Sequence, residues 1–306
     1  MELTKEIVSA EAKKVGFDIV GFSDTVPLSS EIDNLNNWIA NGFQAGMNYM
    51  ERNIEKRQDV KNILPNAKSV ISLGLNYYTS HKHSPKKGYG KISRYGWGID
   101  YHYIIWEMLD KLISELQKIN STFEAKSYVD TGPVMDKVWA VRSGLGWVGK
   151  HSNVINKNFG SWFFIAEIIT TSSFSPDVPS NDFCGNCTKC IDACPTSAIV
   201  SEGVVDANKC ISYLTIENKC EIANEFIGKF DNWLFGCDIC QDVCPWNNKF
   251  AKESVFEEFQ PKLGTELNLI EIEEMTNQQF KSKFEKSPIK RSKLKGLKRN
   301  AEFLLR

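Results

Sequence analysis

Two cysteine-rich runs constrain the fold of this chain more than any other feature. The first, CGNCTKCIDACP, extends from Cys184 to Pro195, and the second, CDICQDVCP, extends from Cys237 to Pro245. All nine cysteines lie between Cys184 and Cys244, and none precedes them. A disulfide framework would spread over the chain that it staples, so this concentration instead indicates a metal-binding module.

The first run has the spacing C-x2-C-x2-C-x3-C-P, which is typical of bacterial ferredoxins. In that pattern three thiolates bind one [4Fe–4S] cluster, and the cysteine before proline binds a second cluster. The second run repeats the pattern without its leading cysteine, which would stand at Leu234. The two runs therefore predict two [4Fe–4S] clusters. The expected ligands of the first cluster are Cys184, Cys187, Cys190 and Cys244. The expected ligands of the second are Cys194, Cys237, Cys240 and one further cysteine.

Either Cys210 or Cys220 must supply the missing ligand, and Cys210 is favoured. It follows the stretch VVDANK, where ferredoxin-like chains return toward the cluster, whereas Cys220 lies in the polar stretch NKCEIANEF and would be a free thiol. Two alternatives to clusters are weaker. Zinc sites rarely use three cysteines at this spacing followed by Cys-Pro, and a catalytic dithiol would leave most of the pattern unexplained.

Composition predicts a soluble cytoplasmic protein with no membrane partner. The formal net charge of −1 does not by itself indicate a polyanionic partner. The first residues lack the apolar stretch of a signal peptide. The most apolar segment, from Trp162 to Ile169, is too short to cross a bilayer and contains Glu167.

The expected fold class is α+β, in three parts. Helical and extended patterns alternate over residues 1–175 and predict an α/β domain, followed by the cysteine module at 176–250 and a helical, basic segment at 251–306. Pro133 is expected in the first turn of a helix that ends near Ser143. The other helical patterns lie at residues 7–15, 32–39 and 101–116, and the extended runs lie at 17–22, 69–75 and 161–170.

Longer motifs connect the cysteine pattern to a known family. No G-x-G-x-x-G follows an extended run and no P-loop is present, so nucleotide binding by these routes has no support. The motifs are YVDTGPVMDK (128–137), RSGLGWVGKHSNVI (142–155), GSWFFIAEI (160–168), CISYLTIE (210–217), RYGWGIDYHYII (94–105) and SPIKRSKLKGLKRNA (287–301). Together with the cysteines, they resemble the epoxyqueuosine reductases over nearly the whole chain.

The resemblance implies a cobalamin-dependent iron–sulfur enzyme related to reductive dehalogenases, with a cobalamin-binding domain at the N-terminus. Such enzymes reduce the epoxide of epoxyqueuosine at the tRNA wobble position, which gives queuosine in its last biosynthetic step. The resemblance also places Cys210 among the cluster ligands and implies base-off cobalamin without a histidine ligand. Many members carry a helical-repeat extension beyond the last motif, so some tRNA contacts are expected to differ here.

The resemblance implies that Asp130, in VDTGP, is the proton donor; the alternative is a helix N-cap. Asp136 is expected to be a surface charge. A D-x-H-x-x-G cobalamin motif would need glycine where Ile105 stands, so His102 is interpreted as structural. His81 and His83, which precede His102 in the sequence, are expected at the surface. The expected cobalamin contacts are Arg57, Asp130, Lys150, His151, Asn153 and Ser212.

Residues 281–299 contain nine lysines and arginines against a single glutamate, which indicates a phosphate-binding patch for tRNA. The expected partners are tRNA carrying epoxyqueuosine and an unidentified electron donor, and a monomer is expected. Two other functions stay open: a cobalamin-dependent reductase of a small molecule, and an electron-transfer protein. A bound corrinoid would exclude the electron-transfer function.

Overall fold

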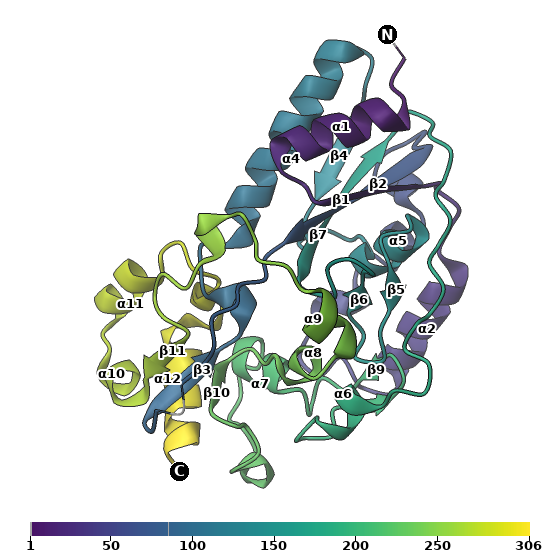
Figure 1. The fold of residues 1–306 in the computed structure, drawn as a ribbon. Coiled ribbons are helices and arrows are strands. Elements are labelled where there is room, and N and C mark those ends of the chain that lie inside the picture. The colour runs from purple at the N-terminus through teal and green to yellow at the C-terminus, as the bar shows by residue number, and fades with distance from the viewer. Residues whose placement is uncertain (1, 85) are drawn as a thin grey trace.

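A four-stranded antiparallel sheet forms the centre of the N-terminal half (Figure 1). The computed structural model describes residues 2–84 and 86–306. In sheet order the strands are β1 (Ile19–Ser23), β2 (Ser69–Asn76), β7 (Phe163–Thr170) and β4 (Ala125–Tyr128). Three of the four match the extended runs in the sequence, and the fold mixes helices and strands as expected.

Helices cover both faces of this sheet, which is why β2 is buried at every position. On one face, α1 (Lys5–Val15) and α4 (Tyr101–Ile119) pack together over Ile71 and Leu73. On the other, α2 (Ser29–Ala40), α3 (Ile54–Gln58) and α5 (Asp136–Arg142) contribute to a second core with Val70. Helix α5 begins at Asp136, so the prediction that Pro133 lies in its first turn was wrong.

Glu167 is a carboxyl group buried inside this sheet. It is fully buried on β7, where Ser72 donates a hydrogen bond of 2.7 Å to its Oε2, and its Oε1 has no hydrogen-bond partner in the part of the chain that the structure describes. Burial raises the pKa of Glu167 well above its ordinary value, and the nearby charge of Asp136 raises it further. We therefore infer that the carboxyl group is protonated in the folded protein.

Replacing Glu167 with glutamine is expected to remove a loss of stability at high pH. Above the unfolded pKa of about 4.3, the folded state holds one more proton than the unfolded state, so stability falls as pH rises toward the folded pKa, by up to about 1.4 kcal/mol per pH unit. Thermal unfolding midpoints at pH 5 and pH 8 measure this. Glu167→Gln should lose less stability over this range than the unmodified protein or the exposed control Glu107→Gln. Equal losses in all three proteins would contradict the protonated state.

A smaller sheet joins the three parts of the chain. It has the order β10 (Trp233–Phe235), β3 (Tyr89–Ile92) and β11 (Glu266–Asn268). Its central strand comes from residues 1–175, and its outer strands come from the other two predicted parts. Strand β11 was not expected, because the last part was predicted to be helical.

The remaining C-terminal elements are helical and pack on this sheet. They are α10 (Leu269–Glu274), α11 (Asn277–Phe284) and α12 (Lys293–Leu305). His83 lies beside the same sheet. It is half-buried, not at the surface as predicted, because its ring lies edge-on to Trp97 and Trp233 and its Nε2 is 2.9 Å from the carbonyl oxygen of Ile92. His81 is exposed, as predicted.

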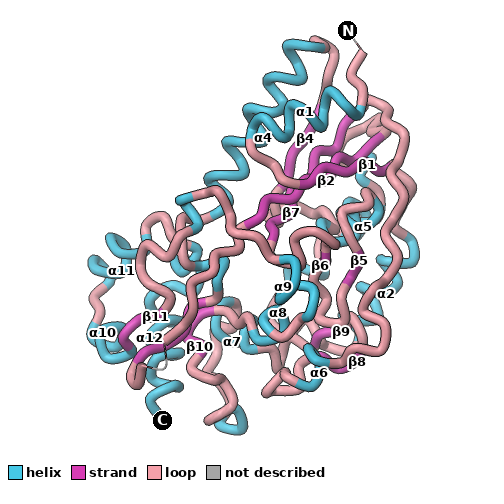
Figure 2. The backbone as a smooth tube through the Cα atoms, in the orientation of Figure 1, coloured by secondary structure: helices cyan, strands magenta, loops and turns pink. Residues whose placement is uncertain are grey.

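The cysteine-bearing segment consists largely of loops between short helices and hairpins (Figure 2). Its elements are α6 (Lys189–Asp192), β8 (Ile199–Ser201), β9 (Val204–Val205), α7 (Ile211–Ile216), α8 (Ile239–Asp242) and α9 (Pro245–Phe250). The hairpin β5 (Trp147–Val148) and β6 (Val154–Ile155) lies against it. The 3-10 helices are η1 (Asn48–Glu51), η2 (Val60–Asn62), η3 (Arg94–Gly96), η4 (Asn224–Phe226), η5 (Glu257–Phe259) and η6 (Pro288–Ser292). No helix among the described residues is both long enough and apolar enough to cross a membrane.

Candidate active site between two cysteine-lined cavities

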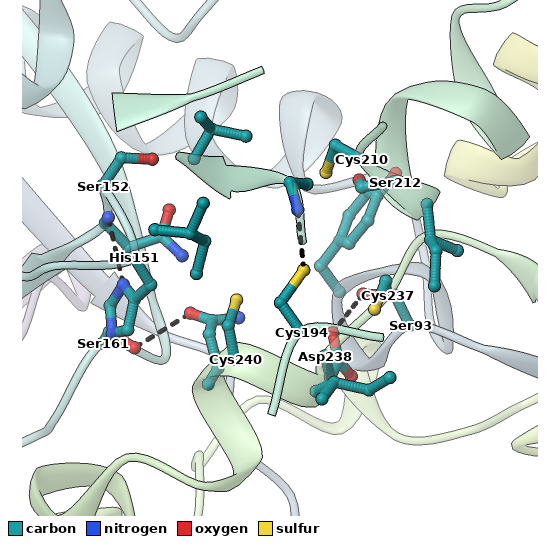
Figure 3. A pocket seen from close by; sticks show the side chains of 18 of the residues that line it. Ser93, His151, Ser152, Ser161, Cys194, Cys210, Ser212, Cys237, Asp238 and Cys240 are labelled. Carbon is teal, nitrogen blue, oxygen red and sulfur yellow. Dashed lines mark hydrogen bonds between the residues drawn. The ribbon is translucent and has the colours of Figure 1, made fainter. Parts of the chain in front are cut away.

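Four cysteines line a cavity of about 390 Å³ (Figure 3). Cys194 follows α6, Cys210 immediately precedes α7, Cys237 lies between β10 and α8, and Cys240 lies within α8. The ninth cysteine, Cys220, is exposed and does not line this cavity. The structure therefore brings together the four residues that the spacing assigns to the second cluster.

The other four cysteines line a second cavity of about 170 Å³. Cys184, Cys187 and Cys190 come from the first run, and Cys244 comes from the second. Trp147 Nε1 donates a hydrogen bond of 3.5 Å to Cys184 Sγ. Each cavity thus takes one cysteine from the opposite run, which is the exchange that the ferredoxin spacing predicts. Cluster ligation by these eight residues stays a prediction.

A hydrogen bond reaches one cysteine sulfur in each cavity. The backbone N–H of Ala198 donates to Cys194 Sγ at 3.2 Å, and hydrogen bonds of this kind stabilise cluster-bound thiolates. Burial raises the pKa of several thiols without metal, among them Cys190, Cys210 and Cys244. Cluster binding would therefore release protons from these side chains.

Polar side chains line the larger cavity together with the cysteines. His151 and Asn153 come from the turn between β5 and β6, and Ser212 lies at the start of α7. His151 lines both cavities, and its Nε2 is buried without a hydrogen-bond partner among the described residues. Burial, and next the charge of Lys137, lowers the pKa of His151 to about 4, so this imidazole is neutral. Neutral polar groups in an open cavity fit the amide-bearing edge of a corrin.

Two expected cobalamin contacts lie elsewhere. Lys150 lines the smaller cavity and forms an ion pair of 2.6 Å with Glu202. Arg57 is buried on α3, where its guanidinium donates to the carbonyl oxygens of Arg52 and Tyr49, both at 3.3 Å, and it lines neither cavity. These two residues are thus not grouped with His151, Asn153 and Ser212.

Lys137 is a cavity residue that sequence reasoning missed. Its Nζ donates to the carbonyl oxygen of Ser152 and to Asn153 Oδ1, each at 2.9 Å, so it holds the turn that contributes polar groups to the larger cavity. The signal was present in the motif YVDTGPVMDK, which ends at this lysine.

Asp130 lies just after β4, beside the larger cavity. Its backbone is in the left-handed region, with φ of +42°. The Tyr101 hydroxyl, which lines the cavity, donates a hydrogen bond to Asp130 Oδ2, and His102 Nε2 lies 2.9 Å from Oδ1. The residue before α5 that occupies the N-cap position is Met135, so the capping interpretation of Asp130 was wrong. Its carboxylate, about half exposed, is available to a substrate above the cavity.

Asp136 was expected to be a surface charge, and this prediction was wrong. It is the first residue of α5, it is partly buried, and its Oδ1 has no hydrogen-bond partner within residues 2–84 and 86–306. Burial, together with the nearby charge of Asp130, raises the pKa of Asp136 to about 7. The Asp136 carboxyl group is therefore partly protonated at neutral pH.

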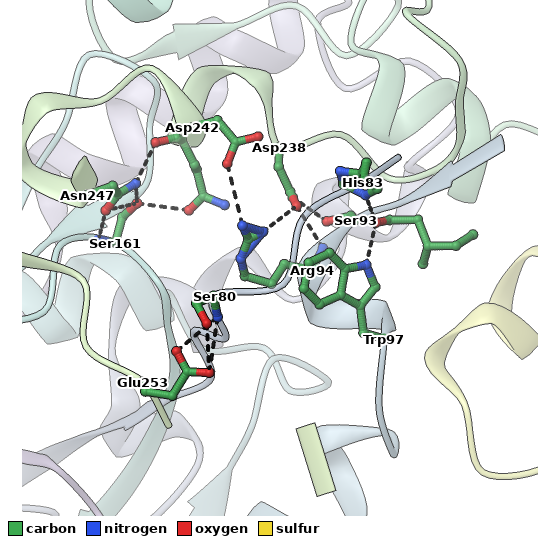
Figure 4. A network of polar contacts seen from close by, with 12 residues as sticks. Ser80, His83, Ser93, Arg94, Trp97, Ser161, Asp238, Asp242, Asn247 and Glu253 are labelled. Atoms are coloured by element: carbon green, nitrogen blue, oxygen red, sulfur yellow. Dashed lines mark hydrogen bonds and ion pairs between the residues drawn. The ribbon is translucent and has the colours of Figure 1, made fainter. Parts of the chain in front are cut away.

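Arg94 fixes the second cysteine run against the N-terminal half (Figure 4). Its buried guanidinium carbon lies 4.7 Å from the ring centroids of both Trp97 and Trp162. The guanidinium nitrogens lie 3.9 Å from carboxylate oxygens of Asp238 and Asp242. The backbone N–H of Arg94 also donates a hydrogen bond of 2.7 Å to the Asp238 carboxylate. A charge buried with partners from the cysteine run holds that run in one place.

The basic segment at 281–299 is only partly available for phosphate. Arg299 is buried, because its guanidinium donates to the carbonyl oxygens of Leu214, Asn218 and Cys220. Arg291 pairs with Glu217. The exposed lysines of the segment are Lys281, Lys283, Lys286, Lys293 and Lys295.

Comparison with known proteins identifies the family. Residues 183–247 match the model of the 4Fe-4S double cluster binding domain, and residues 57–131 match that of epoxyqueuosine reductase QueG. An epoxyqueuosine reductase of Leadbetterella byssophila is 47% identical over 305 residues, covering 99% of this chain and 98% of the relative. The chain belongs to the epoxyqueuosine reductase family. The epoxyqueuosine reductase of Cellulophaga algicola is 46% identical over the same shares of both chains.

Solved structures of epoxyqueuosine reductases share the whole fold. One, with an epoxyqueuosine-modified stem loop of tRNA-Tyr, is 36% identical with a TM-score of 0.92, covering 98% of this chain and 80% of that one. The enzyme of Streptococcus thermophilus is 32% identical over the same shares, with a TM-score of 0.90. A reductive dehalogenase, NpRdhA, is 15% identical with a TM-score of 0.51, over 80% of this chain and 32% of that one, which relates the folds alone. The predictions of the family and of two [4Fe–4S] clusters are confirmed.

Proposed function

We propose that this protein reduces the epoxide of epoxyqueuosine in tRNA and so forms queuosine. The observation that carries the proposal is one cavity lined both by four cysteines and by Tyr101, whose hydroxyl group donates a hydrogen bond to the Asp130 carboxylate. A source of electrons and a source of protons therefore meet at the same cavity. A relative with 36% identity was crystallised with an epoxyqueuosine-modified tRNA stem loop, which supports this substrate.

In this proposal base-off cobalamin would bind on the polar side of the larger cavity, beside the second cluster, and would supply a strongly reducing cobalt centre. His151, Asn153 and Ser212 would hold its polar edge, and Lys137 fixes the turn that carries two of these residues. Tyr101 and His102 orient Asp130, whose carboxyl group delivers a proton to the epoxide oxygen as the C–O bond breaks. A positioned acid contributes about 10²–10⁴-fold to such a step.

The surface near Asp130 suits an RNA loop. Tyr49, Tyr103 and Trp106 are exposed aromatic residues, and Lys290 Nζ lies 4.6 Å from the centroid of the Tyr103 ring. Aromatic faces stack on unpaired bases, and lysines attract phosphates. We propose that the exposed lysines of residues 281–295 contact the tRNA backbone, and that the protein acts as a cytoplasmic monomer with a separate electron donor.

Conversion of epoxyqueuosine in tRNA is the direct test. Anaerobic protein with both clusters, cobalamin and a strong reductant should yield queuosine, detected by mass spectrometry of digested tRNA. Omission of cobalamin is the control and should abolish the product. If tRNA binding rests on lysine–phosphate contacts, affinity should fall steeply with salt. If protein that holds both clusters and cobalamin forms no queuosine, the proposal is wrong and a small-molecule substrate is favoured.

A further inference from the structure

Reduction of an epoxide to an alkene requires more protons than one carboxyl group holds. The overall change consumes two electrons and two protons, and the epoxide oxygen leaves as water. Breaking the first C–O bond converts the oxygen to a hydroxyl group with one proton, and breaking the second releases it as water with another. Asp130 can hold one proton at a time, so the site needs a source that refills it.

His102 lies where such a source would have to be. Its Nε2 is 2.9 Å from Asp130 Oδ1, and its Nδ1 is 2.7 Å from Asp100 Oδ1. A neutral imidazole has one N–H and can donate to only one carboxylate, whereas an imidazolium donates to both. With carboxylates on both sides, the geometry therefore favours the charged ring. Its side chain is 15% exposed, so solvent can return a proton to it.

The charges around this histidine support the same state. Burial alone would lower the pKa of His102, but the hydrogen bonds to Asp100 and Asp130 outweigh burial and raise the pKa to about 9. The opposing groups are the amino end of α4, where His102 is the second residue, and Lys290, whose Nζ lies 3.3 Å from Asp100 Oδ2.

Other charged or titratable groups reach the pair from four further elements. Tyr101 donates to Asp130 from α4 itself. Tyr49 of η1, Arg291 of η6 and Asp136 of α5 each interact electrostatically with Asp130. Tyr95 of η3 does the same. These groups act on the Asp130 carboxylate. The imidazole nitrogens of His102 themselves contact Asp100 and Asp130.

We propose that His102 is an imidazolium in the resting protein and supplies, through Asp130, both protons that the reaction consumes. His102 Nε2 gives its proton to Asp130 Oδ1, and Asp130 gives a proton to the epoxide oxygen as the first C–O bond breaks. Solvent reprotonates His102, and the same transfer releases the hydroxyl group as water when the second C–O bond breaks. The two electrons come from the clusters and cobalamin of the function proposed above, on which this inference rests. His102 acts through Asp130 and is a positioning residue.

The pH dependence of single-turnover rates tests this role. The unmodified protein should hold a constant rate up to about pH 8 and lose rate above pH 9. In His102→Gln, an amide can still donate to Asp130 but cannot carry a proton. Its rate should be about 10–100-fold lower at pH 7 and should fall steadily as pH rises from 6. The control His81→Gln, at an exposed histidine that contacts Gln260 and not Asp130, should match the unmodified protein.

A direct titration decides the charge of His102. The chain has four histidines, so carbon-13 NMR of histidine-labelled holo-protein should resolve one ring that titrates near pH 9, and His102→Gln should remove that signal. Four rings that all titrate below pH 8 would overturn the proposal, as would a His102→Gln variant with an unchanged pH profile. Absence of queuosine from the unmodified protein would instead count against the proposed function, and the NMR titration would still decide the state of His102.

Discussion

Replacing Asp130 with asparagine is expected to lower queuosine formation by about 10²–10⁴-fold. Asparagine has nearly the same size, and its amide oxygen can still accept a hydrogen bond from Tyr101 or His102. It cannot donate a carboxylic proton to the epoxide oxygen. The variant should therefore fold, retain both clusters and bind cobalamin, with the loss confined to the chemical step. Single-turnover mass spectrometry of tRNA nucleosides measures it.

Asp110→Asn is the matched control for this prediction, because Asp110 is an exposed carboxylate on α4. It should retain the full rate. Iron content and cobalamin binding must be equal in the two variants and the unmodified protein. A turnover rate of Asp130→Asn within a few-fold of the unmodified rate would show that Asp130 is not the acid.

Replacing Cys210 with serine is expected to reduce the iron content from about eight atoms per chain to about four. Cys210 lines the larger cavity with Cys194, Cys237 and Cys240, and its loss leaves that cluster with three sulfur ligands. Queuosine formation should fall to background, because the cluster beside the proposed cobalamin site would be missing. Iron and sulfide assays on anaerobically purified protein give the count.

Cys220→Ser is the control, because this cysteine is exposed and lines neither cysteine cavity. It should keep about eight iron atoms and full activity. A normal iron count in Cys210→Ser together with a depleted Cys220→Ser would show that the missing ligand of the second run had been assigned to the wrong residue.

Local patterns predicted the parts of this protein that depend on neighbouring residues. The spacing of the cysteine runs anticipated which residues share a cavity, because a cluster of fixed size requires fixed intervals between its ligands. Apolar periodicity located β2, β7 and α4, which are long and strongly patterned.

Features that depend on distant contacts could not be predicted in this way. Strands β3, β10 and β11 have four residues or fewer, too few for a periodic signal. His102 was interpreted as structural because Ile105 breaks the cobalamin motif, and its contact with Asp130, 28 residues away in sequence, is not visible in a local pattern. Arg299 was assigned to a phosphate-binding patch, but its partners are carbonyl oxygens about 80 residues earlier in the chain.

The sheet formed by β10, β3 and β11 sets an order of maturation. Its pairs join Lys91 to both Trp233 and Glu266, so none of them can form until most of the chain has been synthesised. Such distant pairings form late, since the entropy cost of closing a long loop comes before any stabilising contact is made. Strand β10 ends two residues before Cys237. We therefore expect the second cluster site to be completed only after the chain has closed around it, so that iron–sulfur assembly acts on a nearly finished protein rather than on a nascent ferredoxin-like domain.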